Sequence, residues 1–551
     1  MKMKRLISLL LMVAVLCSLT TVFAEPEEPK FPITDEKITL SVLTGMDARV
    51  ENYETNATTK WLEEKTNIHL DWEVVGDIVQ SKAVILASGD YPDILLSSFI
   101  TQQEIIKYGV QQGVFLPLND LIEKYGYNTK RVFEQSPYAY TDAVAPDGNI
   151  YALSQVNEAY HMTLRNKMWI NTQWLDNLGL EMPTTTDELL EVLIAFRDKD
   201  PNGNGKKDEI PLTGIGTYSN IGSSSARSYY SPLAYLISAF ITFDTQNGWI
   251  QPFEGKVDVS FNKEAFREGL RFVRKLYEEG LIDPEFATQD ATTLRAKIAY
   301  EDGNLIGMFA SHSPSAFCDL NAEPHKAYMP LMPVEGPGGL RSTANYPYTL
   351  DDSSGFANAF IITTSCEHPE IAFKLADFLY SDEFVYRAYF GEAGKEYRVC
   401  EPGEIAIDGG QALYEPLITF TDIQNVNWNQ KGNLNRSSAW RLGQLAEQDI
   451  MKPTGLETRL YQATVAYSEF ATPDEQVLPP TLFIPEEENA EYAQIKLTVD
   501  GYVAESLNNF VTGKMSIDTD WDQYVKTLED MGLPRYLEIL QSAYDASIYA
   551  K

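Results

Sequence analysis

The sequence contains little cysteine. Only four cysteines occur among 551 residues, at positions 17, 318, 366 and 400. Cys17 falls within an N-terminal apolar run, so the remainder of the chain can form at most one disulfide. A fold that depends on a disulfide framework is therefore excluded. The chain must rely on an ordinary hydrophobic core, which a sequence of this length can supply.

Positive charge is also scarce. The chain has 44 Lys and Arg residues against 79 Asp and Glu residues, which leaves a net charge of −35. A negative field of this size repels nucleic acid and anionic membrane surfaces, so we expect neither as a partner. It favours solubility, and we expect a monomer.

Familiar catalytic signatures are missing. The sequence has no Gly-x-Ser-x-Gly elbow, no His-Glu-x-x-His motif and no Walker loop. Its five histidines are scattered, and each is explained more simply as a structural residue. Paired carboxylates stay open as a possibility, because 79 acidic residues make accidental pairs common.

Long apolar runs are confined to the N-terminus. Three basic residues in the first five positions precede the apolar run Leu6–Leu16, and Val22-Phe23-Ala24 follows. This pattern predicts a signal peptide of residues 1–24, and the run is shorter than the roughly 20 residues that span a bilayer. Its removal takes away three basic and no acidic residues, so the net charge falls from −35 to −38. We expect an exported protein that is periplasmic, cell-surface or secreted.

The first part of the remaining chain alternates between strand and helix patterns. Residues 25–37 are rich in Pro and Glu and predict a tether. Apolar alternation predicts strands over 38–43, 69–75 and 94–96, with helices over 58–65 and 81–87 between them. This order indicates a parallel α/β sheet. Ligands bind beyond the carboxyl ends of such strands, which makes Asp47 a candidate ligand-binding residue.

Helical spacing dominates the rest of the chain. Apolar residues recur at helical intervals over 187–196, 263–279, 369–380 and 490–510. Strand-like pieces return at 305–309 and 360–363.

Several short phrases follow one another in a recognisable order. The first is Leu86-Ala87-Ser88-Gly89-Asp90-Tyr91-Pro92-Asp93-Ile94, and later ones include Gly148-Asn149-Ile150-Tyr151-Ala152-Leu153, Glu279-Gly280-Leu281-Ile282-Asp283-Pro284 and Phe510-Val511-Thr512-Gly513-Lys514. Together they resemble the family 1 extracellular solute-binding proteins of ABC importers, in the large lipoprotein-type branch that includes alginate-oligosaccharide-binding proteins. One departure is Leu16, since lipidated cysteines follow a small residue; we interpret Cys17 as part of the discarded run.

The resemblance implies a periplasmic-binding-protein type II fold, with two lobes joined by a hinge and a ligand cleft between them. We expect an N-terminal lobe over 38–160 with return segments near 300–365. We expect 161–300 and 366–551 to form mainly the C-terminal lobe and the hinge helices. The function implied is capture of a carbohydrate, in particular an oligosaccharide, for delivery to the permease subunits in the membrane.

The clearest ligand set for a cation lies in the segment 198–209. Its oxygen-bearing residues alternate with Pro, Gly and Lys, and such spacing suits a loop that wraps calcium. One frame begins at Asp198 and the other at Asp200. The second resembles the calcium loop of alginate-binding relatives, and its expected ligands are Asp200, Asn202, Asn204, the Lys206 carbonyl, Asp208 and Glu209. We expect a structural Ca²⁺ here; the alternative is a polar turn without metal.

Aromatic residues among amides and arginines are candidates for the sugar site, because sugars present apolar faces and polar edges. The candidates in addition to Asp47 are Tyr229, Tyr230, Trp249, Tyr346, Trp428, Trp440 and Arg441. Arg436 and Arg441 could hold a uronate carboxylate through paired hydrogen bonds. The alternative for each aromatic residue is packing in the core.

Two other functions share this composition. A secreted polysaccharide-degrading enzyme would also be acidic and rich in aromatic residues, and it would release new products from a glycan. A glycan-adhesion module would prefer long chains over the short oligomers that fit between closing lobes.

Overall fold

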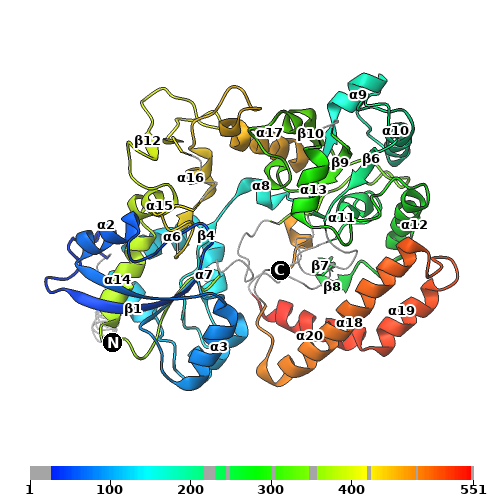
Figure 1. Ribbon diagram of the computed structural model, residues 1–551. Helices are drawn as coiled ribbons and strands as arrows, with labels where there is room; N and C mark the ends of the chain where they lie inside the picture. Colours follow the sequence, from blue (N-terminus) through cyan, green and yellow to red (C-terminus); the bar gives the residue numbers. More distant parts are fainter. Residues whose placement is uncertain are drawn as a thin grey trace, which may run out of the picture.

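The computed structural model describes residues 26–215, 230–243, 248–300, 304–346, 357–418, 423–479 and 482–547. Within these ranges the chain forms two lobes, each built on its own four-stranded sheet (Figure 1). The predicted signal peptide and Tyr229 lie outside the described residues. In the part of the chain that is described, no helix has both the length and the apolar composition that a membrane span requires.

The sheet of the first lobe has the strand order β11-β3-β1-β2. Its strands are β1 (Ile38–Gly45), β2 (Ile68–Val75), β3 (Ile94–Leu96) and β11 (Phe360–Ile362). β1 runs parallel to β2 and β3, with Ile38 opposite Ile68 and Val42 opposite Ile94, whereas β11 is antiparallel to β3. The predicted alternation of strands and helices is confirmed, with α2 (Ala57–Thr66) and α3 (Ile78–Ser88) as the connecting helices.

Local side chains set the limits of both connecting helices. Asn56 accepts a hydrogen bond from the Thr58 backbone N–H at 3.0 Å, and Asp77 accepts one from Gln80 at 3.0 Å. Each bond satisfies a backbone donor that has no partner inside its helix. The helices end at Asn67 and Gly89, which have φ values of 61° and 83° in the left-handed region.

Further helices of the first lobe come from two distant parts of the chain. They are α4 (Gln102–Glu104), the π-helix η1 (Ile105–Gln111), α5 (Asn119–Tyr125), α6 (Tyr127–Gln135), α7 (Pro137–Ala143), α14 (Pro369–Leu379), α15 (Asp382–Tyr389) and α16 (Ser438–Leu442). Asp377 on α14 accepts hydrogen bonds from the backbone N–H groups of Asn128 and Thr129 at 3.1 and 2.7 Å. Burial raises the pKa of Asp377, while these bonds favour its charged form.

Part of the predicted tether packs against the first lobe. The Phe31 ring meets the Phe378 ring edge to face, with centroids 4.6 Å apart, and the Lys65 ammonium lies 4.4 Å from the Phe31 centroid. The Ile33 backbone N–H donates to the Thr66 carbonyl at 3.1 Å. This segment is therefore anchored, although its Pro and Glu content predicts an extended linker.

The sheet of the second lobe has the order β10-β5-β9-β6. Its strands are β5 (Met168–Asn171), β6 (Ile210–Thr213), β9 (Ile306–Ala310) and β10 (Tyr328–Leu331). β6 is parallel to β9, and β5 is antiparallel to both β9 and β10. The helices of this lobe are α8 (Tyr160–Thr163), α9 (Thr172–Leu178), α10 (Thr186–Asp198), α11 (Pro232–Ile237), α12 (Glu264–Glu278), α13 (Ala291–Ile298), α17 (Leu456–Ser468), α18 (Glu486–Thr512), α19 (Trp521–Asp530) and α20 (Leu533–Ala546).

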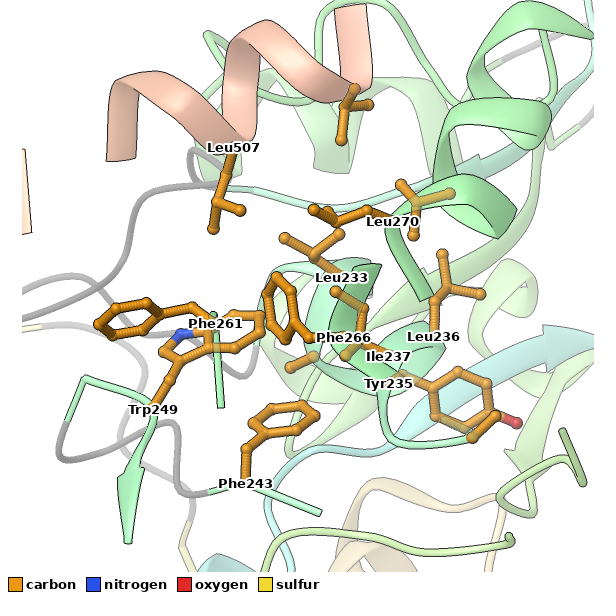
Figure 2. Packing of buried hydrophobic residues seen from close by; sticks show 14 of the residues in the cluster. Leu233, Tyr235, Leu236, Ile237, Phe243, Trp249, Phe261, Phe266, Leu270 and Leu507 are labelled. Atoms are coloured by element: carbon orange, nitrogen blue, oxygen red, sulfur yellow. The ribbon is translucent and has the colours of Figure 1, made fainter. Parts of the chain in front are cut away.

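The core of the second lobe lies between α11, α12 and α18, beside the hairpin of β7 (Ile250–Phe253) and β8 (Lys256–Val259). Leu233, Leu270 and Leu507 from the three helices point toward one another in this core (Figure 2). Trp249 stacks on Phe243 with ring centroids 4.6 Å apart and an interplanar angle of 9°. The apolar positions predicted for residues 263–279 and 490–510 form the buried faces of α12 and α18.

The predicted division of the chain between the lobes needs correction. Of the described strands near 300–365, where we expect return segments of the first lobe, β11 joins the sheet of the first lobe, whereas β9 and β10 belong to that of the second. Helices α14 and α15 fall in 366–551, where we expect mainly the C-terminal lobe and hinge helices, but they pack in the core of the first lobe. The buried strands and helices are apolar in both lobes, so sequence alone does not reveal which sheet each one joins.

Two described connections pass between the lobes. One leaves β4 (Val156–Asn157) and enters α8, and the other leads from α16 to α17. At the first connection, β4 pairs in parallel with β14 (Asn435–Arg436). These connections bring α16 of the first lobe and α17 of the second close to the same cavity.

Candidate functional site

A cavity of about 500 Å³ lies beside the connection between α16 and α17. This volume is within the range of about 300–1,000 Å³ that is usual for small-molecule sites. The residues that line it are Arg49, Tyr389, Phe390, Tyr414, Glu415, Pro416, Leu417, Ile418, Gln424, Asn427, Asn429, Gln430, Trp440, Arg441, Gln444, Leu445, Ala446, Glu447, Gln448, Pro453, Thr454, Leu456 and Glu457. Most belong to the first lobe, whereas Leu456 and Glu457 begin α17 of the second.

Four aromatic side chains form one wall of the cavity. Trp440 stacks on Tyr414 with centroids 5.4 Å apart and an interplanar angle of 22°, and it lies 5.8 Å from Phe390 at 27°. Tyr389 meets Trp440 edge to face at 5.2 Å. Tyr389 ends α15 and Phe390 follows it directly, Trp440 lies in α16, and Tyr414 belongs to β13 (Tyr414–Pro416), so packing among three elements fixes the wall.

A polar contact joins the two lobes at this cavity. The Arg441 guanidinium on α16 lies 4.0 Å from the Glu457 carboxylate on α17, and it donates to Asn157 Oδ1 at 3.3 Å. Tyr160 Oη donates to Glu457 Oε2 at 3.0 Å. Burial disfavours the charge on Arg441, but the neighbouring Tyr389 and Glu457 more than offset it and raise the pKa of Arg441.

A residue just after the carboxyl end of β1 supports part of the lining of the cavity. Asn429 Nδ2 donates to both carboxylate oxygens of Asp47, at 3.0 and 3.1 Å. Asn429 and Arg49 line the cavity, whereas Asp47 is absent from its lining. Asp47 therefore holds a lining residue in place instead of facing the cavity itself.

The predicted site residues divide into two groups. Trp440 and Arg441 lie together in the cavity lining. Trp428, Trp249, Tyr230 and Tyr346 are absent from the lining; exposure alone does not separate the two groups, because Trp440 is itself only 7% exposed.

Trp428 is a core residue of the first lobe. Its side chain is 1% exposed, and its indole N–H donates to Thr59 Oγ1 at 2.8 Å. Its ring meets Trp72 and Phe384 edge to face at 5.3 and 5.2 Å. The neighbouring amides Asn427 and Asn429 favour a sugar site in the sequence. In the structure, an amide of this pair instead binds the loop backbone, because Asn427 Oδ1 accepts a hydrogen bond from the Asn429 backbone N–H at 2.9 Å.

The other three predicted aromatic residues also pack inside the protein. Trp249 is 4% exposed in the core of the second lobe (Figure 2). Tyr230 packs on Phe317 with centroids 4.9 Å apart. Tyr346 is covered by the Arg165 guanidinium, 4.0 Å from its ring centroid.

Sequence reasoning missed Tyr389, Phe390, Tyr414 and Glu457. The first two continue the apolar pattern of α15, and this pattern is also expected of an ordinary buried helix end. Tyr414 and Glu457 stand in no motif. Only the folded chain brings these residues together with Trp440.

The loop at 200–208 joins α10 to β6 and turns back on itself. Asp200, at φ 49°, accepts hydrogen bonds from the backbone N–H groups of Asn204 and Gly205 at 3.1 and 3.0 Å. The Asn204 side chain donates to both Asp208 oxygens at 3.2 and 3.3 Å. The Lys206 backbone N–H donates to Asn204 Oδ1 at 2.8 Å, and its ammonium lies 5.9 Å from the Tyr300 ring centroid.

Glu209 closes this loop with a perturbed carboxyl group. Burial, followed by the charges of Asp200 and Asp208, raises the pKa of Glu209. Its Oε1 is buried and has no hydrogen-bond partner among the described residues. Nowhere in the described ranges do three His, Cys, Asp or Glu side chains gather into a metal cluster, so a cation in this loop would also need amide and carbonyl oxygens.

Two lobes with separate sheets, and a cavity whose wall is completed by residues of both, define a two-lobed ligand-binding protein. The chain belongs to the family of bacterial extracellular solute-binding proteins, whose family model matches residues 48–385. Both the resemblance noted in the sequence and the two-lobed fold that it implies are confirmed.

Individual relatives cover nearly the whole chain. The fructooligosaccharide ABC transporter substrate-binding protein FusA of Streptococcus pneumoniae is 27% identical over 530 residues, which span 94% of this chain and 91% of that protein. The structure of FusA in complex with kestose matches 92% of this chain and 99% of that chain, with a TM-score of 0.73 and 25% identity. An HMO-binding solute-binding protein from Bifidobacterium longum infantis matches 94% and 99%, with a TM-score of 0.75 and 25% identity.

A third solved structure is that of an alginate-binding protein, the kind of relative that the sequence resembles. The alginate-binding protein AlgQ2 matches 93% of this chain and 99% of that chain, with a TM-score of 0.62 and 23% identity. At this identity the likeness supports the fold alone.

Proposed function

We propose that this protein captures an oligosaccharide in the cavity between its lobes and delivers it to the membrane permease of an ABC importer. The observation that carries the proposal is the stacked wall of Tyr414 and Trp440, which lies beside the inter-lobe pair Arg441 and Glu457. The family membership and the ligands in the names of the FusA and HMO-binding relatives support it.

The wall suits a sugar for a chemical reason. Aromatic rings present flat apolar faces, against which the C–H face of a sugar ring can pack. Amides and charged groups at the edge of the cavity then exchange hydrogen bonds with the hydroxyl groups, and these bonds fix the orientation of the ligand. Gln444 and Gln448 provide such donors and acceptors in the lining.

Closure of the lobes follows from the position of the site. A ligand that contacts α16 of the first lobe and α17 of the second binds the closed form more tightly than the open form. This difference in affinity shifts the population toward closure. The permease subunits would then recognise the closed form, and the sugar would leave with its covalent bonds intact.

Calorimetric titration of the mature protein with an oligosaccharide panel tests this proposal. We expect saturable binding and unchanged ligand on recovery. Trp440→Ala should weaken binding at least about tenfold, because a lost stacking contact costs about 1.4 kcal/mol or more. The matched control is Tyr140→Ala, which removes an aromatic ring that is 52% exposed outside the cavity. Equal affinity of both variants, or the appearance of cleaved sugar, would overturn the proposal.

We also propose that the loop holds a structural Ca²⁺ through Asp200, Asn202, Asn204, the Lys206 carbonyl, Asp208 and Glu209. The buried Oε1 of Glu209 favours a cation at this point. Asp198, the start of the other frame, is engaged by Arg197 through two bonds of 2.8 and 2.9 Å, which favours the frame that begins at Asp200. A structure of FusA is described as that of an EF-hand mutant, which supports a cation-binding loop in this family.

We propose that the protein is exported. Cleavage after Ala24 would release a monomer to the periplasm, the cell surface or the medium. The family description as extracellular supports this placement.

A further inference from the structure

The charged groups in the lining of the cavity are close to balance. Two guanidinium groups, of Arg49 and Arg441, face three carboxylates, of Glu415, Glu447 and Glu457. The class of sugar that this site accepts depends on which negative groups of the protein already lie beside these cations.

The arginines expected to hold a uronate are already engaged. Arg441 is paired with Glu457 at 4.0 Å and also donates to Asn157. Arg436 is fully buried outside the lining, where it donates to Gln155 Oε1 at 2.6 Å and lies 5.3 Å from the Tyr389 ring centroid. A ligand carboxylate that bound Arg441 would lie beside the Glu457 carboxylate, and the two negative charges would repel each other.

The carboxylates of the lining are engaged as well. Glu447 lies 3.1 Å from the Lys452 ammonium and accepts from Thr454 Oγ1 at 3.2 Å. Glu415 lies 2.5 Å from Arg398. Arg398 in turn holds Glu404 through two bonds of 2.7 Å, so it has little capacity left for a further anion.

Arg49 is the remaining cation of the described lining. Its backbone N–H donates to the Asp47 carboxylate at 2.9 Å, and the same carboxylate accepts from the lining residue Asn429, so an acidic group lies at the edge of the cavity that Arg49 lines. The net charge of the chain, −35, adds a field that opposes the approach of anions. Hydroxyl groups meet no such penalty, because they can donate to paired carboxylates and exchange bonds with amides.

We infer that the cavity selects neutral oligosaccharides and discriminates against oligosaccharides that carry carboxylates. This inference rests on the proposed capture of an oligosaccharide and specifies the class of ligand. The geometry that supports it is the pairing of Arg441 with Glu457 in the wall shared by the two lobes.

Titration of the full mature protein with neutral and uronate trisaccharides, in equal buffers of physiological ionic strength, tests the inference. We expect a neutral trisaccharide of the panel to bind and every uronate trisaccharide to bind at least about tenfold more weakly. Equal or tighter binding of a uronate would overturn the inference while leaving oligosaccharide capture intact. Absence of binding by every sugar would overturn both.

A charge variant gives a second readout. Glu457→Gln removes the negative charge beside Arg441 with little change in shape. The ratio of the dissociation constants of uronate and neutral trisaccharides should therefore fall several-fold. Glu491→Gln is the matched control, since this glutamate pairs with Arg535 on the second lobe and is absent from the lining. If Glu457→Gln keeps the melting temperature of the wild type and the ratio of the two dissociation constants does not change, the role assigned to the ion pair is wrong.

Discussion

At the scale of single residues, Trp428 and Trp440 show how one stretch of sequence supplies two different environments. Both stand among amides and arginines, yet only Trp440 lines the cavity. Trp428 packs against Trp72 and donates to Thr59. The difference arises from the neighbours that each ring meets in the folded chain, which local composition does not encode.

A substitution of Trp428 tests this assignment. Trp428→Ala should lower the free energy of unfolding by about 3–5 kcal/mol, because it removes a large buried ring and leaves a cavity. Trp428→Phe should keep ligand affinity within about twofold, since the ring does not line the cavity. Urea denaturation and calorimetric titration measure the two effects. A large loss of affinity in a folded Trp428→Phe protein would place this residue in the site.

Lys167 leads to a prediction about pH. It is fully buried one residue before β5, where its ammonium donates to the His161 carbonyl at 3.0 Å and to the Leu164 carbonyl. Burial lowers the pKa of Lys167 from its ordinary value of 10.5 to about 7. Between these two values the unfolded chain binds more protons at this position than the folded chain, so stability should rise with pH in that window.

The expected slope is at most about 1.4 kcal/mol per pH unit above pH 7. Below pH 7 both states carry the proton, and the contribution of Lys167 becomes constant. Urea denaturation of the wild type and of Lys167→Met at several pH values between 6 and 9 measures the difference. Parallel stability profiles for the two proteins would contradict the prediction.

At the scale of elements, the local patterns of the sequence are sufficient for the four strands of the first-lobe sheet and for helices α2, α3 and α14, but not for the short helices between residues 102 and 143. Alternating apolar residues predict β1 and β2, and Gly89 marks the end of α3. The partners of β9 and β10 are not predictable in this way, because a strand such as β9 is buried at every position and carries no face preference. Pairing between distant segments decides which sheet each strand joins.

The loop between α10 and β6 is the element with the most distinctive sequence. Calcium at about 1 mM should stabilise the protein by about 1.4 kcal/mol if the dissociation constant is about 10⁻⁴ M. Thermal unfolding with calcium and with a chelator measures this gain. Asp208→Asn should reduce it, whereas Asp71→Asn, on an exposed position of β2, should not. Equal melting temperatures of the wild type with calcium and with chelator would contradict the proposed site.

At the scale of the whole molecule, ordered family phrases along the chain predict two lobes correctly, but they do not locate the ligand wall. That wall depends on Tyr389 and Tyr414 of the first lobe and on Glu457 of the second, which lie far apart in sequence and meet only after folding. The same arrangement explains how one ligand can hold both lobes together. In the proposed function, ligand contacts with α16 and α17 would stabilise the closed arrangement that the membrane permease recognises.

A crystal structure of the protein with a bound neutral oligosaccharide tests most directly whether the ligand binds between the two lobes at the aromatic wall. We predict a sugar ring against the Trp440 and Tyr414 side chains, with a hydrogen bond from the same ligand to Glu457 of the second lobe. A ligand that lies elsewhere, or one that touches a single lobe, would contradict it.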